Sequence, residues 1–190
     1  MRTCAWCGGE LPERVTGRPA RFCSGRCRVA AHRGSKRLPV VPVEMVAQDR
    51  WVRRDGKRPV TVDGSPASST ASDSWSPLRS VLDSPVGDGF GFMLGGGFGC
   101  IDLDHCVAPD GTVCEWARLV LDLLPATYVE VSPSGTGLHI FGWLPEGPGR
   151  NLHGVEVYSR ARFMTVTATP FEGAPAALGD LSEVAAALTA

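Results

Sequence analysis

The stretch 89-GFGFMLGGGFGCIDLD-104 decides the fold class. Two runs rich in aromatic and aliphatic residues, 89–94 and 98–103, flank three consecutive glycines at 95–97. Short β-prone runs separated by a glycine turn are typical of a β-hairpin. We therefore expect two strands here that pair in an antiparallel sheet.

Strand patterns outnumber helix patterns along the rest of the chain. Two further pairs of β-rich runs predict two more hairpins, 128–131 with 138–143 and 154–158 with 162–167. Helical patterns occupy three places, 73–82, 113–124 and 181–188. Asp73 or Ser74 can cap the first of these helices. Trp116 and Tyr128 are expected in the core. Together these elements predict an α+β fold, with a mostly antiparallel sheet and flanking helices.

Two acids end the quoted stretch, in the run Ile101-Asp102-Leu103-Asp104. Successive side chains on a strand point to opposite faces, so Asp102 and Asp104 project together while their aliphatic neighbours enter the core. Adjacent carboxylates repel each other unless a cation lies between them, and Mg2+ or Mn2+ is such a cation. The alternative is a pair of solvent-facing acids at a strand end. His105 is expected on the opposite face, without a ligand role.

A glycine turn and a third acid follow. The run 132-SPSGTGLH-139 places His139 in an otherwise apolar strand, where a core histidine is the alternative to a functional one. Glycines permit close backbone approach, so the N–H groups of this turn are expected to face phosphate oxygens. Glu156 alternates with valines and either joins a metal cluster or is a surface acid. Lys57 lies in a basic turn that could contact a nucleotide.

Four cysteines near the N-terminus form two closely spaced pairs, Cys4 with Cys7 and Cys23 with Cys27. Two such pairs can place four thiolates on one tetrahedral Zn2+, and so small a module needs a metal for stability. Free cysteines or a redox pair are the alternatives, and His32 could replace one thiolate. The other three of the seven cysteines, Cys100, Cys106 and Cys114, are expected to be thiols in or near the core.

Charge is divided unequally along the chain. Residues 1–58 hold 14 Lys/Arg against 5 Asp/Glu, and residues 59–190 hold 5 against 15. A basic half indicates a nucleic-acid partner, and an acidic half attracts cations. The cations around the cysteines are expected to contact phosphates of DNA or RNA, with a solvated charged face as the alternative; they are Arg18, Arg21, Arg26, Arg28, Arg33, Lys36 and Arg37.

Three blocks of sequence, in order, resemble the motifs of the archaeo-eukaryotic primase superfamily. They are I-D-L-D-H-C, E-V-S-P-S-G-T-G-L-H-I-F and V-E-V-Y-S-R-A-R-F-M-T-V-T, and they are most similar to the primase–polymerase domains of phages and plasmids. The resemblance covers about residues 50–170 and implies an RRM-like catalytic core. The cysteine module lies outside it and looks like the small Cys4 knuckles, ending in C-R-x-A-A-x-R, of actinobacterial and phage proteins.

The resemblance implies a role for individual residues. Asp102, Asp104 and Glu156 match the ligands of catalytic Mg2+ or Mn2+, and His139 matches the histidine that contacts the phosphates of the incoming nucleotide. The remaining nucleotide-binding residues implied are Ser134, Gly135 and Gly137 of the turn, together with Arg162 and Lys57.

The expected protein is therefore a DNA primase/polymerase of phage or plasmid replication, a nucleotidyltransferase with three parts. These are a zinc-binding module at 1–37, a linker at 38–48 and a primase–polymerase catalytic domain at 49–190. Its expected partners are a single-stranded DNA template, NTP or dNTP and a separate replicative helicase. No run approaches the roughly 20 apolar residues that span a bilayer, and the N-terminus is unlike a signal peptide, so we expect a protein of the (host) cytoplasm with no membrane partner. A catalytically silent nucleic-acid-binding module and a metal-dependent nuclease are the alternatives.

Overall fold

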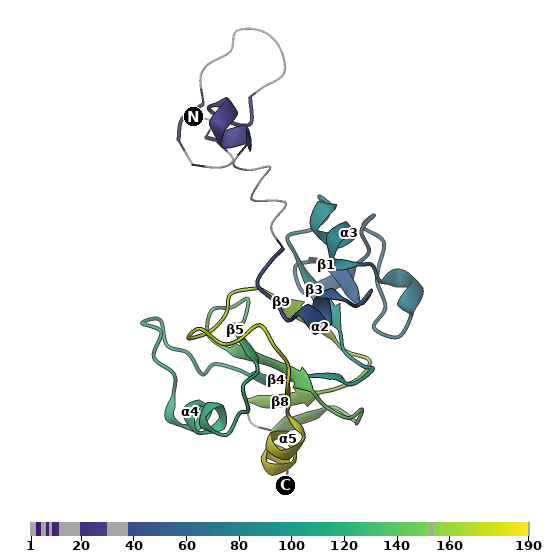
Figure 1. Cartoon of the computed structure of the whole chain (residues 1–190), viewed down its shortest axis with the longest axis vertical. Coiled ribbons are helices and arrows are strands. Elements are labelled where there is room, and N and C mark those ends of the chain that lie inside the picture. Colours follow the sequence, from purple (N-terminus) through teal and green to yellow (C-terminus); the bar gives the residue numbers. More distant parts are fainter. Residues whose placement is uncertain are drawn as a thin grey trace. The chain divides into compact units, whose positions relative to one another are not determined.

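The structure is a computed structural model, which describes residues 3, 4, 7, 9–11, 20–29, 38–152 and 154–189. Contacts within the chain divide it into two compact units, Met1–Pro39 and Val40–Ala190. The strands and helices labelled in Figure 1 belong to the second unit. The first unit is described below through its cysteines.

The Val40–Ala190 unit contains two sheets. The smaller sheet has the antiparallel order β2-β1-β3-β9, with β1 at Trp51–Asp55, β2 at Arg58–Val60, β3 at Gly89–Met93 and β9 at Phe163–Val166. The larger sheet has the order β10-β6-β4-β8-β7, with β5 also paired to β6; its strands are β4 Phe98–Leu103, β5 Tyr128–Val131, β6 Leu138–Trp143, β7 Arg150–Leu152, β8 Val155–Tyr158 and β10 Gly179–Asp180. Among the described strands, β10 with β6 is the parallel pair. The predicted α+β class with mostly antiparallel pairing is confirmed.

Two of the three predicted hairpins are wrong. β3 and β4 lie in different sheets, and only a single bridge, Gly95 with Phe98, joins their ends. All three glycines at 95–97 have positive φ, a conformation that lets the chain swing from one sheet to the other instead of folding back. β8 and β9 likewise belong to different sheets, with Ala161 between them at φ 49°. The hairpin of β5 and β6 is confirmed.

Three helices follow the sequence patterns with shifted bounds, which are α3 at Leu78–Asp83, α4 at Glu115–Asp122 and α5 at Ser182–Thr189. A further helix, α2 at Val43–Val46, lies in the predicted linker, where no helix was expected. The helix predicted at 73–82 is split into a 3-10 turn, Ser72–Ser74, and α3, because Pro77 disfavours helical backbone at the residue before it. Trp116 is 39% exposed, against the expectation of a core position, whereas Tyr128 is fully buried. The inward face of α4 is formed by Ala117 and Val120.

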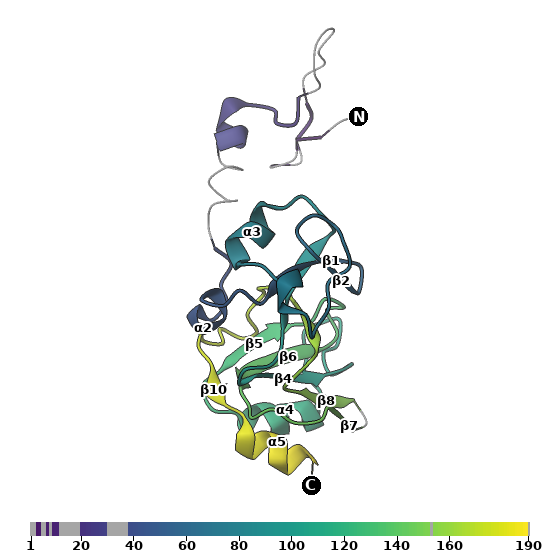
Figure 2. The same ribbon diagram turned by 90° about the vertical axis from the view of Figure 1, so that its right-hand side faces the viewer.

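The larger sheet is covered on both faces, which explains why β4 and β6 are buried at nearly every position. Side chains such as Ile101 and Ile140 pack on one face with α4 and α5. Cys100 and Phe141 on the other face join a core with Phe92 of the smaller sheet. Figures 1 and 2 show the same arrangement from two sides, with α4 and α5 on one side of β4 and β8, and β1, β3 and α3 on the other.

The compact unit begins before the predicted boundary at residue 49. Val41 and Met45 lie within the predicted linker 38–48, yet both are buried in the core between the sheets. The indole N–H of Trp51 donates to the backbone oxygen of Met45 at 2.9 Å. The segment around α2 is therefore part of the fold.

Candidate active site

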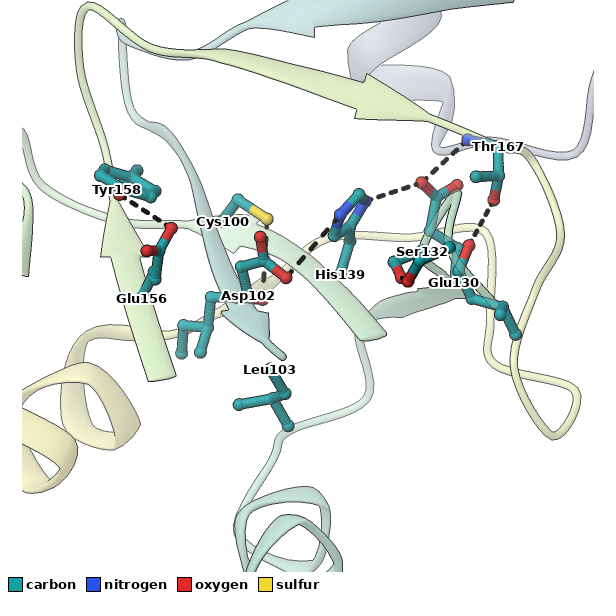
Figure 3. Close-up of polar contacts among 12 residues, drawn as sticks. Cys100, Asp102, Leu103, Glu130, Ser132, His139, Glu156, Tyr158 and Thr167 are labelled. Carbon is teal, nitrogen blue, oxygen red and sulfur yellow. Dashed lines mark hydrogen bonds and ion pairs between the residues drawn. The ribbon is translucent and has the colours of Figure 1, made fainter. Parts of the chain in front are cut away.

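Polar residues form one row across the larger sheet. In the antiparallel register, Asp102 on β4 lies opposite His139 on β6 and opposite Glu156 on β8. The row continues at both ends, because His139 lies opposite Glu130 on β5 and Glu156 opposite Asn151 on β7. Cross-strand neighbours on antiparallel strands project to the same face, so five polar side chains from five strands stand side by side. Figure 3 shows Glu130, His139, Asp102 and Glu156 of this row.

Two acids of this row converge with a third, Asp104. Oxygen atoms of Asp102, Asp104 and Glu156 all lie within 4.8 Å of one another. Asp104 follows the last residue of β4, where its N–H donates to the backbone oxygen of Gly154 at 2.8 Å. The buried Oδ1 of Asp102 has no hydrogen-bond partner among the residues that the structure describes. Oxygen ligands at this spacing, one of them without a partner, fit a divalent cation.

The pKa of Asp102 is raised from its ordinary value to about 6. Burial is the main cause, because it disfavours the charged carboxylate, and the charges of Asp104 and Glu156 add to the rise. His139 and Arg162 act in the opposite direction but do not cancel the rise. A bound cation would relieve both the burial of charge and the repulsion.

His139 is buried between two carboxylates. Its Nδ1 lies 3.3 Å from Oε1 of Glu130, and its Nε2 lies 3.8 Å from Oδ1 of Asp102 (Figure 3). Burial acts to lower the pKa of His139, but the hydrogen bond to Glu130 and the negative charges of Asp102 and Glu130 raise it overall. This environment is unlike that of an ordinary core histidine.

Glu130 was missed in the sequence analysis. It stands within the apolar run Tyr-Val-Glu-Val, which suggested only a strand. The residue is nevertheless completely buried. The predicted hairpin contained the information needed, because a pairing that closes with Val131 opposite Leu138 places Glu130 opposite His139.

Neighbours of Glu156 hold its carboxylate in place. The hydroxyl of Tyr158 donates to Oε2 at 2.9 Å, and the side-chain amide of Asn151 donates to Oε1. The guanidinium of Arg162 lies 3.8 Å from Oε2 and stacks 4.1 Å above the centre of the Tyr158 ring. One cation is therefore held beside the acids without a direct hydrogen bond to them.

The row opens into a cavity of about 870 Å³. Predicted residues that line it are Asp102, Asp104, His139, Ser134, Arg162 and Lys57. Ser69, in a hydroxyl-rich loop that the sequence also marks as able to contact a nucleotide, lines the cavity as well. Arg54 and Ser132 line it too, and the sequence analysis did not select them as site residues. His105 also lines the cavity, although it was expected on the opposite face of the strand. Its φ of 52° is not that of a strand, so side chains no longer alternate between the two faces at this position.

The glycine turn packs against the end of β4. A Cβ atom on Gly137 would lie 2.7 Å from the backbone oxygen of Leu103, so only glycine allows this close approach. The N–H of Gly135 donates to the Ser132 oxygen at 2.9 Å, and that of Thr136 to the Ser134 hydroxyl at 3.2 Å. These two N–H groups are engaged within the turn, contrary to the expectation that they face a ligand. Neither Gly135 nor Gly137 is among the described residues that line the cavity.

The first unit brings its four cysteines together. The sulfur atoms of Cys4, Cys7, Cys23 and Cys27 lie within 4.8 Å of one another, as ligands of one tetrahedral Zn2+ require. Residues 25–29 are helical, and the Ser24 hydroxyl accepts the Cys27 N–H at 3.1 Å. Arg21, Arg26 and Arg28 are exposed beside this cluster. The other predicted residues, Arg18, His32, Arg33, Lys36 and Arg37, lie outside the described residues.

Comparison with known proteins found a similar protein from a phage. The chain is 36% identical over 142 residues to a DNA primase-polymerase of Nitratiruptor phage NrS-1. The match covers 65% of this chain and 20% of the relative, so the chain spans about a fifth of the relative's length. No family model matches the sequence. Among the described residues, no helix is long and apolar enough to cross a membrane.

Proposed function

We propose that the Val40–Ala190 unit catalyses template-directed nucleotidyl transfer, as a DNA primase–polymerase in phage or plasmid replication. The observation that carries this proposal is the convergence of Asp102, Asp104 and Glu156 within 4.8 Å of one another, with Asp102 and Asp104 lining a large cavity. The similarity to a phage DNA primase-polymerase supports the same activity. A polymerase needs such a group of acids to place its metal ions.

The three acids suit Mg2+ or Mn2+ because all their ligand atoms are carboxylate oxygens. Two such ions, when bound, would activate the 3′-hydroxyl of the primer and stabilise the pyrophosphate leaving group. The chain supplies the placement. Asp102 is fixed on a central strand, and the carboxylate of Glu156 is oriented by the hydrogen bonds from Tyr158 and Asn151.

Positive and polar groups on the cavity wall would bind the incoming nucleotide. Arg162 and Lys57 provide cationic side chains for the polyphosphate, and His139 and Ser134 provide hydrogen-bonding groups. Gly135 and Gly137 would contribute by shaping the turn that carries Ser134. The volume of about 870 Å³ is within the range of small-molecule sites, so a nucleoside triphosphate fits its size.

The cysteine unit would bind Zn2+ and hold the single-stranded template through its exposed arginines. Arg21, Arg26 and Arg28 carry this role among the described residues, and Arg18, Arg33, Lys36 and Arg37 would extend the charge along the sequence. Contacts to phosphates are independent of base sequence and weaken with salt. A separate replicative helicase would open the duplex, and the site of action would be the cytoplasm of the bacterial host.

The test is nucleotide incorporation on a primed and an unprimed single-stranded template. We expect product with Mg2+ or Mn2+ in the unaltered protein, and a loss of at least about a hundredfold in Asp102→Asn, Asp104→Asn and Glu156→Gln. Asp49→Asn, at an exposed acid before β1, is the matched control and should remain active. Degradation of the template would indicate a nuclease. DNA binding without product under every condition would indicate a silent module.

A further inference from the structure

Glu130 is an ionisable residue at 0% exposure, in a site where burial of charge is costly unless every oxygen is satisfied. Four donors satisfy it. Oε1 accepts from the Thr167 N–H at 2.9 Å and faces Nδ1 of His139 at 3.3 Å. Oε2 accepts from the Ala168 N–H at 2.9 Å and the Tyr128 hydroxyl at 3.0 Å.

The backbone after β9 is shaped to serve this carboxylate. Ala168 has a φ of 53°, a left-handed conformation that is unfavourable for a residue with a side chain. The turn directs two consecutive N–H groups, of Thr167 and Ala168, at the two oxygens of Glu130. The segment then runs beside β5, where the Val131 N–H donates to the Thr169 oxygen at 3.0 Å. Strained backbone at a buried acid indicates that the position of the acid matters.

The contact with Glu130 determines what His139 presents to the cavity. A carboxylate accepts hydrogen bonds, so Nδ1 of the ring carries the proton that faces Glu130. Nε2 is then the nitrogen on the side of Asp102 and the cavity, and at 3.8 Å from Oδ1 it is not tied to that carboxylate by a hydrogen bond. In histidines that meet ligands, the partner of the far nitrogen commonly fixes the ring orientation and tautomer.

We propose that Glu130 is a positioning residue, which fixes the imidazole of His139 so that Nε2 faces the nucleotide in the cavity. The role in nucleotide binding rests on the proposed polymerase function. The competing explanation is a purely structural carboxylate that only ties the 167–168 turn to β5. The two explanations differ in whether the state of the His139 ring and the affinity for nucleotide depend on Glu130.

Glu130→Gln tests the proposal with a side chain of the same shape. Its single oxygen cannot accept from both pairs of donors, and its NH2 group has to face one of them. If the NH2 group faces Nδ1 of His139, two donors meet and the ring has to change tautomer. If it faces Ala168, the Ala168 N–H loses its acceptor. We expect the KM for dNTP to rise by about tenfold or more with kcat changed less than about threefold, which is the sign of lost ground-state binding. The affinity for single-stranded DNA should stay unchanged.

A double-mutant cycle with His139→Ala separates the two explanations. If Glu130 acts through His139, then Glu130→Gln has no further effect on the KM in the His139→Ala background. An additive effect would contradict the proposal. Thr127→Val is the matched control, because Thr127 is also buried and its hydroxyl donates to the Phe141 oxygen and accepts the Gly179 N–H, so its hydrogen bonds are to groups other than His139. Its KM for dNTP should equal that of the unaltered protein even if its stability falls.

A second measurement does not require enzymatic activity. Nitrogen-15 NMR of the four histidines, with His139 assigned by its loss in His139→Ala, reports which ring nitrogen carries a proton. We expect a protonated, hydrogen-bonded Nδ1 in the unaltered protein, with the signal changed in Glu130→Gln. An unprotonated Nδ1 in the unaltered protein would overturn the positioning role. Absence of nucleotide incorporation together with the expected ring signal would instead overturn the proposed polymerase function alone.

Discussion

Replacing Asp102 by asparagine should stabilise the metal-free protein at neutral pH, although it removes a proposed catalytic group. The side chain is only 16% exposed, and its Oδ1 has no hydrogen-bond partner among the described residues. Asp104 and Glu156 add like charge within 4.8 Å. The charged carboxylate is therefore held in an unfavourable environment, and a neutral side chain of the same shape is not.

The pKa of Asp102 gives the size of the expected difference in the free energy of unfolding. Its ordinary value is 3.8 and the folded protein raises it to about 6. Because the folded value is the higher one, the folded state gains stability below pH 3.8 and loses it as pH rises through 6. At about 1.4 kcal/mol per pH unit, the loss is complete near pH 8 and amounts to about 3 kcal/mol. Asparagine is neutral throughout and does not lose this stability.

Urea unfolding monitored by tryptophan fluorescence from pH 4 to 8, without added divalent metal, measures the difference. We expect the two proteins to be similar at pH 4 and Asp102→Asn to be more stable by about 3 kcal/mol at pH 8. Saturating Mg2+ or Mn2+ should remove most of the difference in stability, since a ligand at a hundred times its dissociation constant adds about 2.7 kcal/mol to the protein that binds it. Asp49→Asn controls for a loss of surface charge. Equal stability of Asp102→Asn and the unaltered protein at pH 8 would refute the reasoning.

Three further outcomes follow from the geometry. Elemental analysis should find one zinc per chain, and Cys23→Ser should lower that ratio, since one of four thiolates is lost. Gly137→Ala should lower the free energy of unfolding by about 1–3 kcal/mol, because its Cβ would meet the Leu103 oxygen, and should reduce nucleotide incorporation by moving the turn. Gly135→Ala, in open space at φ 76°, should cost about 1 kcal/mol of stability and reduce incorporation less than Gly137→Ala does, because its Cβ meets no neighbouring atom. Arg162→Gln should raise the KM for dNTP by about tenfold, as measured by steady-state incorporation, because it removes a cation from the cavity wall.

Most strands, and the faces on which their side chains lie, could be predicted from the sequence. Alternation of apolar and polar residues is local, so Ile101 and Asp102 were assigned to opposite faces correctly. The hairpin of β5 and β6 was also accessible, because its turn is short and joins neighbours in the chain. What links Asp102 to Glu156 is a pairing of strands separated by more than fifty residues, and the sequence pattern contains no signal for it.

Two errors have the same physical origin. A glycine turn predicts a reversal of the chain, but whether the next strand pairs with the previous one depends on which edge is already occupied. β3 has β1 and β9 at its edges, and β4 has β6 and β8, so neither strand had an edge left for the other. The prediction that Trp116 of α4 lies in the core was wrong for a similar reason. Helical spacing identifies two apolar faces on this helix, and tertiary packing selects the face of Ala117 and Val120 while Trp116 stays at the surface.

The positions of the charged groups along the row explain why the three acids lack a neutralising partner and suit a metal ion. At one end Glu130 is satisfied by four donors, one of which is His139, so Nδ1 of the histidine is engaged away from the three acids. On the other side Arg162 lies 3.8 Å from Glu156, beyond hydrogen-bond distance. The acids at Asp102, Asp104 and Glu156 therefore remain under-neutralised in the protein alone. Asp102 and Asp104 line the cavity, where, under the proposed function, a divalent cation and the phosphates of a nucleotide would neutralise each other. An acidic domain would bind an anionic substrate in this way.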